Sequence, residues 1–272
     1  MCIRDSHINP KIAVGFAAKF RSITNIDDID PKLAVLAENS LNVSSLWNQQ
    51  FNEQLLDINH MSWTEYGFIY SQVLKDDGEH FMKAGGKVKW LSGYSAAYVH
   101  TDNFQYNLLN SDTTQYLEGD FAYGYSNNID NLNSGTGLPK AASKFGLGLD
   151  LGFVYEWRPD WKEYKYDMDG ETNLWRRDKD KYKLRAGASI LDIGGMKFQK
   201  GEITSDFSVN TSQLFDLAVF DQASGFASFD SIVDSLTTHN PDWSVTDSKA
   251  TFVMRTPTAA SFQLDYHIWK YF

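Results

Sequence analysis

The residues best suited to catalysis or metal binding are scattered along this 272-residue chain and form no motif. No two of its six histidines are four residues apart, and no Gly-x-Ser-x-Gly sequence marks a nucleophilic serine. The single cysteine, Cys2, excludes an intramolecular disulfide and leaves no zinc-ligand spacing. The sequence therefore predicts a protein that is not an enzyme and holds no metal or cofactor.

Two short segments resemble cofactor or metal motifs but lack a required feature. The glycines of 146–152 resemble a dinucleotide-binding run, which must open a helix, whereas here an alternation of apolar residues continues to Trp157. Residues 167–171, Asp-Met-Asp-Gly-Glu, resemble part of a calcium loop. Because Lys165 and Arg176 would occupy its first and twelfth ligand positions, an EF-hand is excluded.

The composition excludes further classes of function. The chain carries 25 Lys and Arg against 35 Asp and Glu, a net charge of −10, so it lacks the basic excess that binding to nucleic acid requires. No run approaches the ~20 apolar residues of a membrane-spanning helix. A membrane-spanning β-strand needs only ~9–11 alternating residues, so a transmembrane β-barrel stays open.

An alternation with a period of two residues dominates the chain and is longest at 145–157. Its apolar side consists of Phe145, Leu147, Leu149, Leu151, Phe153, Tyr155 and Trp157. At ~3.3 Å per residue, these 13 residues span roughly 40 Å, about twice the length of a globular strand. The same pattern recurs at 11–21, 87–98, 181–190 and 261–268, and it is weaker at 61–74 and 249–256.

Long strands whose second face carries small residues and scattered charges favour a transmembrane barrel over a soluble sandwich. We therefore predict an all-β protein, an antiparallel up-and-down transmembrane β-barrel with about seven spanning strands. Tight turns are expected around Gly78 and Pro257. Long extracellular loops are expected at 25–60, 101–144 and 194–248.

Two segments of these loops have helical patterns. Residues 32–38 follow Pro31, which is favoured at the start of a helix. Residues 211–236 carry apolar residues in steps of three and four, interrupted at Gly225. The sequence therefore predicts short helices in the extracellular loops, the second of them either a lid on the barrel rim or a plug or ligand-contacting element.

If the small-residue face encloses an interior, several charged side chains face that interior. These predicted lumen-facing residues are Lys19, Arg21, Asp150, Glu156, Lys183, Arg185 and Asp265. The alternative is that they only neutralise one another across neighbouring strands. Aromatic rings at strand ends favour the membrane–water interface. The candidates for that position are Trp63, Tyr155, Trp157, Trp269 and Tyr271.

Four segments, at 61–67, 87–98, 145–160 and 181–194, resemble an uncharacterised outer-membrane family of Bacteroidota that is distantly similar to the FadL and PorV barrels. The sequence Thr-Pro-Thr-Ala at 256–259 resembles the Leu-Pro-Ala hairpins of FadL-type proteins. The resemblance implies a location in the bacterial outer membrane, a signal peptide and a barrel of roughly fourteen strands.

On this resemblance, the chain is expected to be a fragment from the middle of such a barrel. Residues 7–272 would form a partial barrel domain, and residues 1–6, Met-Cys-Ile-Arg-Asp-Ser, resemble a translated sequencing adaptor. Since a fragment leaves two strand edges unpaired, the sheet is expected to be strongly curved and incompletely closed.

Three functions are compatible with these expectations. The first is uptake or binding of small hydrophobic molecules by a FadL-like barrel embedded in outer-membrane lipid. The second is a non-transporting outer-membrane scaffold for secretion, as the resemblance to PorV implies. The third is a secreted, soluble β-sandwich that binds glycans. A water-accessible interior would favour transport and a filled one a scaffold, whereas a sandwich would bury Leu147, Leu149 and Leu151 under a second sheet.

Overall fold

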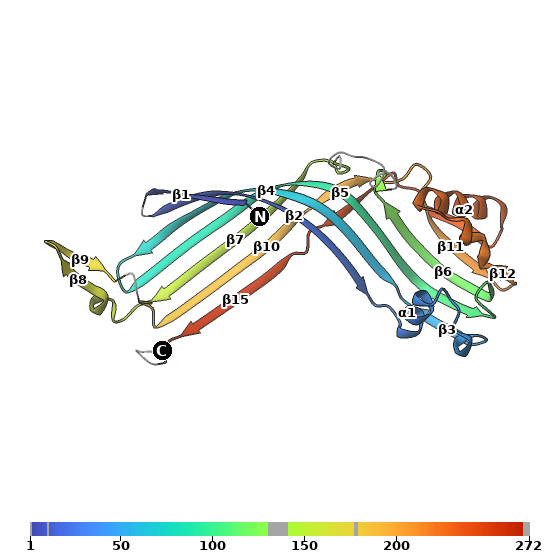
Figure 1. The fold of residues 1–272 in the computed structure, drawn as a ribbon, viewed down its shortest axis with the longest axis horizontal. Coiled ribbons are helices and arrows are strands. Elements are labelled where there is room, and N and C mark those ends of the chain that lie inside the picture. The colour runs from blue at the N-terminus through green and yellow to red at the C-terminus, as the bar shows by residue number, and fades with distance from the viewer. Residues whose placement is uncertain (1, 10, 130–140, 177–178, 269–272) are drawn as a thin grey trace.

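The computed structural model describes residues 2–9, 11–129, 141–176 and 179–268 (Figure 1). Most of this chain forms antiparallel strands that join into one large sheet, curled like half of a barrel. Strands β1 (Cys2–Asn9) and β15 (Ala259–Tyr266) form two edges of the sheet and do not pair with each other. The expected all-β, incompletely closed antiparallel sheet is therefore confirmed.

The other strands of this sheet follow in chain order. They are β2 (Ile12–Asp27), β3 (Gln50–Gln54), β4 (Asp57–Asp76), β5 (His80–Leu108), β6 (Thr113–Tyr125), β7 (Gly146–Trp157), β10 (Leu184–Gln199), β11 (Asp206–Thr211), β12 (Phe215–Asp216), β13 (Trp243–Asp247) and β14 (Thr251–Arg255). A separate hairpin consists of β8 (Lys165–Met168) and β9 (Glu171–Trp175). The helical elements are α1 (Pro31–Glu38), α2 (Phe226–His239) and the 3₁₀ segments η1 (Ser44–Leu46), η3 (Trp161–Tyr164) and η4 (Leu217–Gln222). No helix among the described residues is long and apolar enough to cross a membrane.

The long strand β5 divides the sheet into two limbs. Along one flank it pairs with β4 over most of its length. Along the other flank it pairs with β7 from His80 to Leu91 and with β6 from Ala97 to Leu108. We call the part built on the first half of β5 the bare limb and the part built on its second half the helix-covered limb. Figure 1 shows the bare limb on the left, with β7, β10 and β15, and the helix-covered limb on the right, with β6, β11 and α2.

Two of the expected loops are wrong in part: 101–144 holds the end of β5 and all of β6, and 194–248 holds the end of β10 and the strands β11, β12 and β13. Both faces of β6 carry partly or fully buried residues, so its sequence lacks the clean alternation of a strand with one exposed face. The expected helix at 32–38 is confirmed as α1, and the segment 211–236 contains η4 and α2, which are separated at Gly225 as expected.

The tight turn expected at Pro257 is wrong. The pairing of β10 with β14 continues in one register into its pairing with β15, so the chain runs straight on. The amide of Thr256 donates to the carbonyl of Gly194, and the hydroxyls of Thr256 and Thr258 both donate to the carbonyl of Asp192. Pro257 lacks an N–H, which an edge strand tolerates because one of its flanks has no partner. The turn expected at Gly78 is confirmed between β4 and β5, where this glycine has a φ of +91°.

Candidate functional site

One face of the bare limb is apolar and exposed. In register across four neighbouring strands it presents Phe16, Phe68, Val88 and Leu149, and the first three are 52%, 56% and 56% exposed. Further exposed members of this surface, which we call the apolar belt, are Phe20, Tyr66, Trp90, Leu147, Leu151, Phe153, Phe262 and Leu264. In the described part of the chain no second sheet covers the apolar belt, which contradicts the packed layers that a soluble sandwich requires.

Aromatic rings lie at both ends of the apolar belt. Tyr155 and Trp157 mark the end near the turn between β4 and β5, where the ring N–H of Trp157 donates to Glu79 at 3.3 Å. At the other end Trp90 packs against Phe145, with 5.8 Å between ring centres. Two such rows, with an apolar band between them, are typical of strands that cross a bilayer.

The expected interface position of Trp63 is wrong. Its side chain is 0% exposed, and the guanidinium carbon of Arg21 lies 4.9 Å from its ring centre. Because side chains alternate along a strand, Trp63 shares the face of Glu65 and not the exposed face of Tyr66. Trp269 and Tyr271 lie outside the described residues.

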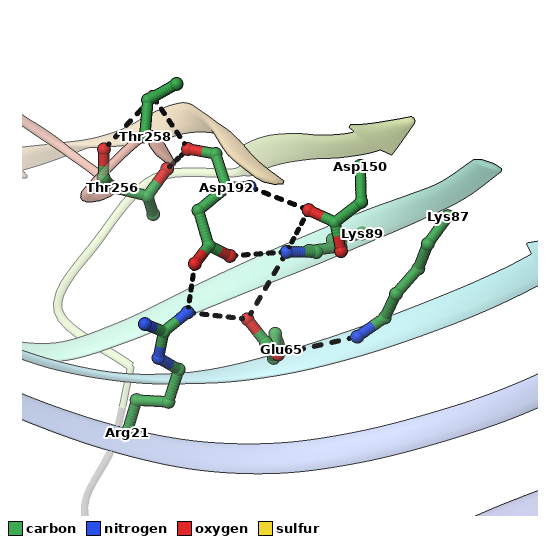
Figure 2. A network of polar contacts seen from close by, with 8 residues as sticks. All are labelled: Arg21, Glu65, Lys87, Lys89, Asp150, Asp192, Thr256 and Thr258. Carbon is green, nitrogen blue, oxygen red and sulfur yellow. Dashed lines mark hydrogen bonds and ion pairs between the residues drawn. The ribbon is translucent and has the colours of Figure 1, made fainter. Parts of the chain in front are cut away.

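The opposite, inner face of the bare limb carries six charged side chains from five strands (Figure 2). We call Arg21, Glu65, Lys87, Lys89, Asp150 and Asp192 the inner ion network. Lys89 is its centre: Nζ lies 2.5 Å from Oδ1 of both Asp150 and Asp192, and 4.0 Å from Glu65 Oε2. The side chains of Lys89 and Glu65 are only 3% and 4% exposed.

Two further cations complete the network. Arg21 Nη1 lies 2.7 Å from Asp192 Oδ2 and 3.7 Å from Glu65 Oε2, and Lys87 Nζ lies 3.4 Å from Glu65 Oε1. Three positive and three negative side chains therefore face one another, so the charges balance. Among the described residues, no group of three or more His, Cys, Asp or Glu side chains could hold a metal ion. The arrangement is suited to neutralising charge inside the sheet.

The ion pair between Arg21 and Asp192 shows that the sheet is strongly curled. Arg21 is on β2 and Asp192 on β10, and the strands β4, β5 and β7 lie between them. In a flat sheet, four strand spacings of ~4.8 Å amount to about 19 Å, which is farther than two side chains can bridge. Their 2.7 Å contact therefore requires this face to be strongly concave.

A β-bulge directs Asp192 into this concave face. The register between β10 and β7 shifts between Ile190 and Ile193, and Asp192 has a φ of +58°. Its amide donates to Asp150 Oδ1 at 2.7 Å, which holds the bulge against β7. Its carbonyl accepts hydrogen bonds from the hydroxyls of Thr256 and Thr258, which lie between β14 and β15. Through Asp192 the bulge thus links the inner ion network to the segment between β14 and β15.

An apolar cluster fills the concave face beyond the network. Trp63, Leu91, Met196 and Phe198 are at most 1% exposed and pack together with residues of β14. Phe198 lies directly over Gly93, where an added Cβ would be 2.4 Å from Cζ of the phenyl ring. The ion network and the apolar cluster therefore occupy the middle of the concave face, and a cavity of about 420 Å³ lined by residues of β4, β5, β7 and β10 adjoins the network.

Comparison with known proteins gives one match. A family model described as a family of unknown function, DUF5723, matches residues 6–272. The chain belongs to the DUF5723 family. No curated protein and no solved structure matches it.

The structure of this DUF5723 protein brings two of the predicted lumen-facing residues, Arg21 and Asp150, into the inner ion network. Glu156 lies near the end of the bare limb, 2.6 Å from Arg158 Nη2 and 3.5 Å from Arg185 Nε. Asp265 accepts a hydrogen bond from the hydroxyl of Tyr182.

Lys19 and Lys183 are exposed and are not members of the network. Lys19 pairs in register with Glu65, and Lys183 precedes β10, where its amide donates to the carbonyl of Trp157. The prediction missed Glu65, Lys87, Lys89 and Asp192 as site residues. The alternation at 87–90 already placed Lys87 and Lys89 on the face opposite Val88 and Trp90. The inward position of Asp192 depends on a bulge, which no local sequence pattern indicates.

In the helix-covered limb of this protein, other parts of the chain cover the face that continues the apolar belt. Tyr98 packs into the inner apolar cluster, whereas the next residue, Val99, packs against the cluster that contains α2. Because neighbouring side chains point to opposite faces, α2 lies on the outer face. Its buried Asp230 accepts hydrogen bonds from Tyr123, Tyr125 and Thr204 at 2.6–2.7 Å.

Replacing Asp230 by alanine is expected to release α2 without unfolding the bare limb. Three donors would lose their charged acceptor, a cost of about 3 kcal/mol, which corresponds to roughly 100-fold faster amide exchange in α2. Hydrogen exchange with mass spectrometry measures this rate for 226–239 and for β5. The exposed Asp234 of the same helix gives the matched control, Asp234→Ala, for which little change is expected. Equal exchange in both variants would contradict the anchoring role.

A second prediction concerns alkaline pH. Burial, reinforced by donation to Asp230, raises the pKa of the Tyr123 hydroxyl above its ordinary value of 10.0. The unfolded chain therefore loses this proton at a lower pH than the folded one, so the stabilisation is complete below pH 10 and is lost as the pH rises further. Urea unfolding of the wild type and Tyr123→Phe should show their stability difference shrinking above pH 10. A difference that stays constant would show that Tyr123 ionises as freely in the folded protein as in the unfolded one.

Proposed function

We propose that this DUF5723 protein is a bacterial outer-membrane β-barrel protein that takes up or binds small hydrophobic molecules. The observation that carries the proposal is the apolar belt, uncovered on one face while the opposite face neutralises its own charges. At ~3.3 Å per residue the 12 residues of β7 span about 40 Å, and a tilt of ~45° gives a height of about 28 Å. That height fits the hydrocarbon layer of a bilayer, which is ~30 Å thick.

The helix-covered limb supports the same orientation. Outside the bilayer, the outer face of the sheet meets water, so its apolar side chains need a protein cover. The cover consists of α1, η4 and α2, which pack against Phe121, Tyr123, Phe207 and Val209 or their neighbours in the same cluster. A sheet that is bare along one limb and covered along the other is expected of a barrel that extends beyond the membrane on one side.

The side chains in the interior argue against a wide aqueous channel. A wide aqueous channel would need an interior that is open along its length, but the ion network and the apolar cluster lie across the middle of the concave face. This supports a path for apolar molecules that avoids water, and it also favours the second candidate, a non-transporting scaffold. Both candidates need partner strands for the two edges, as in a closed barrel of roughly fourteen strands, because unpaired edges are costly in lipid.

Reconstitution of the protein into liposomes tests the proposal. We expect resistance to extraction by plain buffer, a gel mobility that changes on boiling, no ion conductance, and accelerated entry of an uncharged apolar dye. Retention in the membrane without dye entry would favour the scaffold. Extraction into buffer together with unchanged mobility on boiling would contradict both membrane functions.

A further inference from the structure

A cavity of about 520 Å³ lies on the outer face of the helix-covered limb, between the sheet and the start of α2. The sheet contributes Val99, Phe121, Tyr123 and Phe207, and the chain entering α2 contributes residues 223–226 and Phe229. Small-molecule sites are typically cavities of ~300–1,000 Å³ with mostly apolar walls. In size and lining the cavity belongs to this class.

The walls of the cavity are held in place by contacts among themselves. Phe121 and Phe207 are stacked, with 5.0 Å between ring centres and 13° between planes. Tyr123 meets Phe229 edge to face at 5.6 Å, and its hydroxyl is tied to Asp230 of the same helix. A ligand would therefore enter a formed cavity and would not have to order these rings first.

The chemistry of the walls selects against charge. No side chain that lines the cavity is charged, and the hydroxyl of Tyr123 already donates to Asp230. Where the chain enters α2, the amide of Gly225 donates to the hydroxyl of Ser228, which donates in turn to the carbonyl of Gly225. A buried charge without a partner is costly, so a charged ligand would be rejected.

We propose that this cavity binds a small, uncharged, apolar molecule. The inference deepens the proposed function by naming the ligand class and a place for it. It rests on that function in one respect, namely that the outer face of the helix-covered limb continues the membrane-facing surface of the bare limb. Because Val99 and Tyr98 point to opposite faces, the cavity is reached from outside the sheet, without passing the inner ion network.

Photolabelling of the full chain in lipid nanodiscs tests this site. The probe is decanol carrying an aliphatic diazirine, and labelled positions are mapped by mass spectrometry. Labelling of 223–229 should saturate and be displaced by excess decanol, with decanoate at least tenfold less effective. Labelling around Phe68 and Val88, which are exposed on the apolar belt, should rise linearly with probe concentration. Faster initial labelling with probe preloaded in the lipid than with probe added in buffer would identify the bilayer as the source.

Variants decide whether the cavity is the site. Val99→Trp fills it from the sheet and should reduce the saturable labelling at least tenfold, whereas Val35→Trp on the exposed face of α1 should leave it unchanged. If Val99→Trp loses its heat-modifiable mobility, Phe226→Ala, which removes a ring that is 40% exposed, should still reduce labelling severalfold. Non-saturable labelling of 223–229 in a protein that stays in the membrane would overturn the site while leaving the proposed function intact.

Discussion

Replacing Lys89 by methionine is expected to lower the free energy of unfolding by about 3–5 kcal/mol, since removing one partner leaves buried charges uncompensated. Methionine preserves most of the apolar stem but removes the ammonium group that lies 2.5 Å from both Asp150 and Asp192. Glu65, 4% exposed, would retain only its contacts with Arg21 and Lys87. Urea unfolding of the protein in lipid vesicles, followed by tryptophan fluorescence and heat-modifiable mobility, measures this loss.

Two controls separate the network from a general effect of charge. Lys75→Met removes an exposed ion pair with Asp77 at the end of β4, for which at most about 1 kcal/mol is expected. Adding Asp150→Asn to Lys89→Met should restore part of the stability, because asparagine can still accept from the amide of Asp192 while one uncompensated charge disappears. A loss for Lys89→Met as small as that for Lys75→Met would contradict a buried network.

Replacing Val88 by arginine is expected to lower the stability in a bilayer by about 2–4 kcal/mol, the cost of a cation on the lipid face near the middle of a membrane. Val88 is 56% exposed and stands in the row that joins Phe68 to Leu149 across the bare limb. Folding titrations with urea in lipid vesicles measure the difference from the wild type.

The matched control is Val35→Arg on α1, where valine is 43% exposed but belongs to the helix-covered limb. A surface substitution in water typically changes stability by less than about 0.5 kcal/mol. If the apolar belt faces lipid, only Val88→Arg is costly. Similar small effects at both positions would show that the belt is a water-exposed surface and would remove the main support for a membrane protein.

Along β7, which has one exposed face, the direction of the side chains could be predicted from the sequence. Leu147, Leu151 and Phe153 share an exposed face, and Asp150 lies opposite them, as the alternation at 145–157 indicates. The prediction failed where both faces are covered, as in β6, because there the alternation is lost. It also failed at Pro257, since a proline in an edge strand and a proline in a turn have the same local sequence.

The all-β class and the separation of apolar from charged faces follow from the sequence alone, because alternation is a local property of the extended backbone. Which charges meet depends on how the strands pair and how the sheet curls. Arg21 and Asp192 are 171 positions apart and come into contact because the sheet curls and a bulge turns Asp192 inward. The cavity under α2 likewise depends on packing between distant segments. Curl, bulges and packing arise from pairing between remote strands, which no local period encodes.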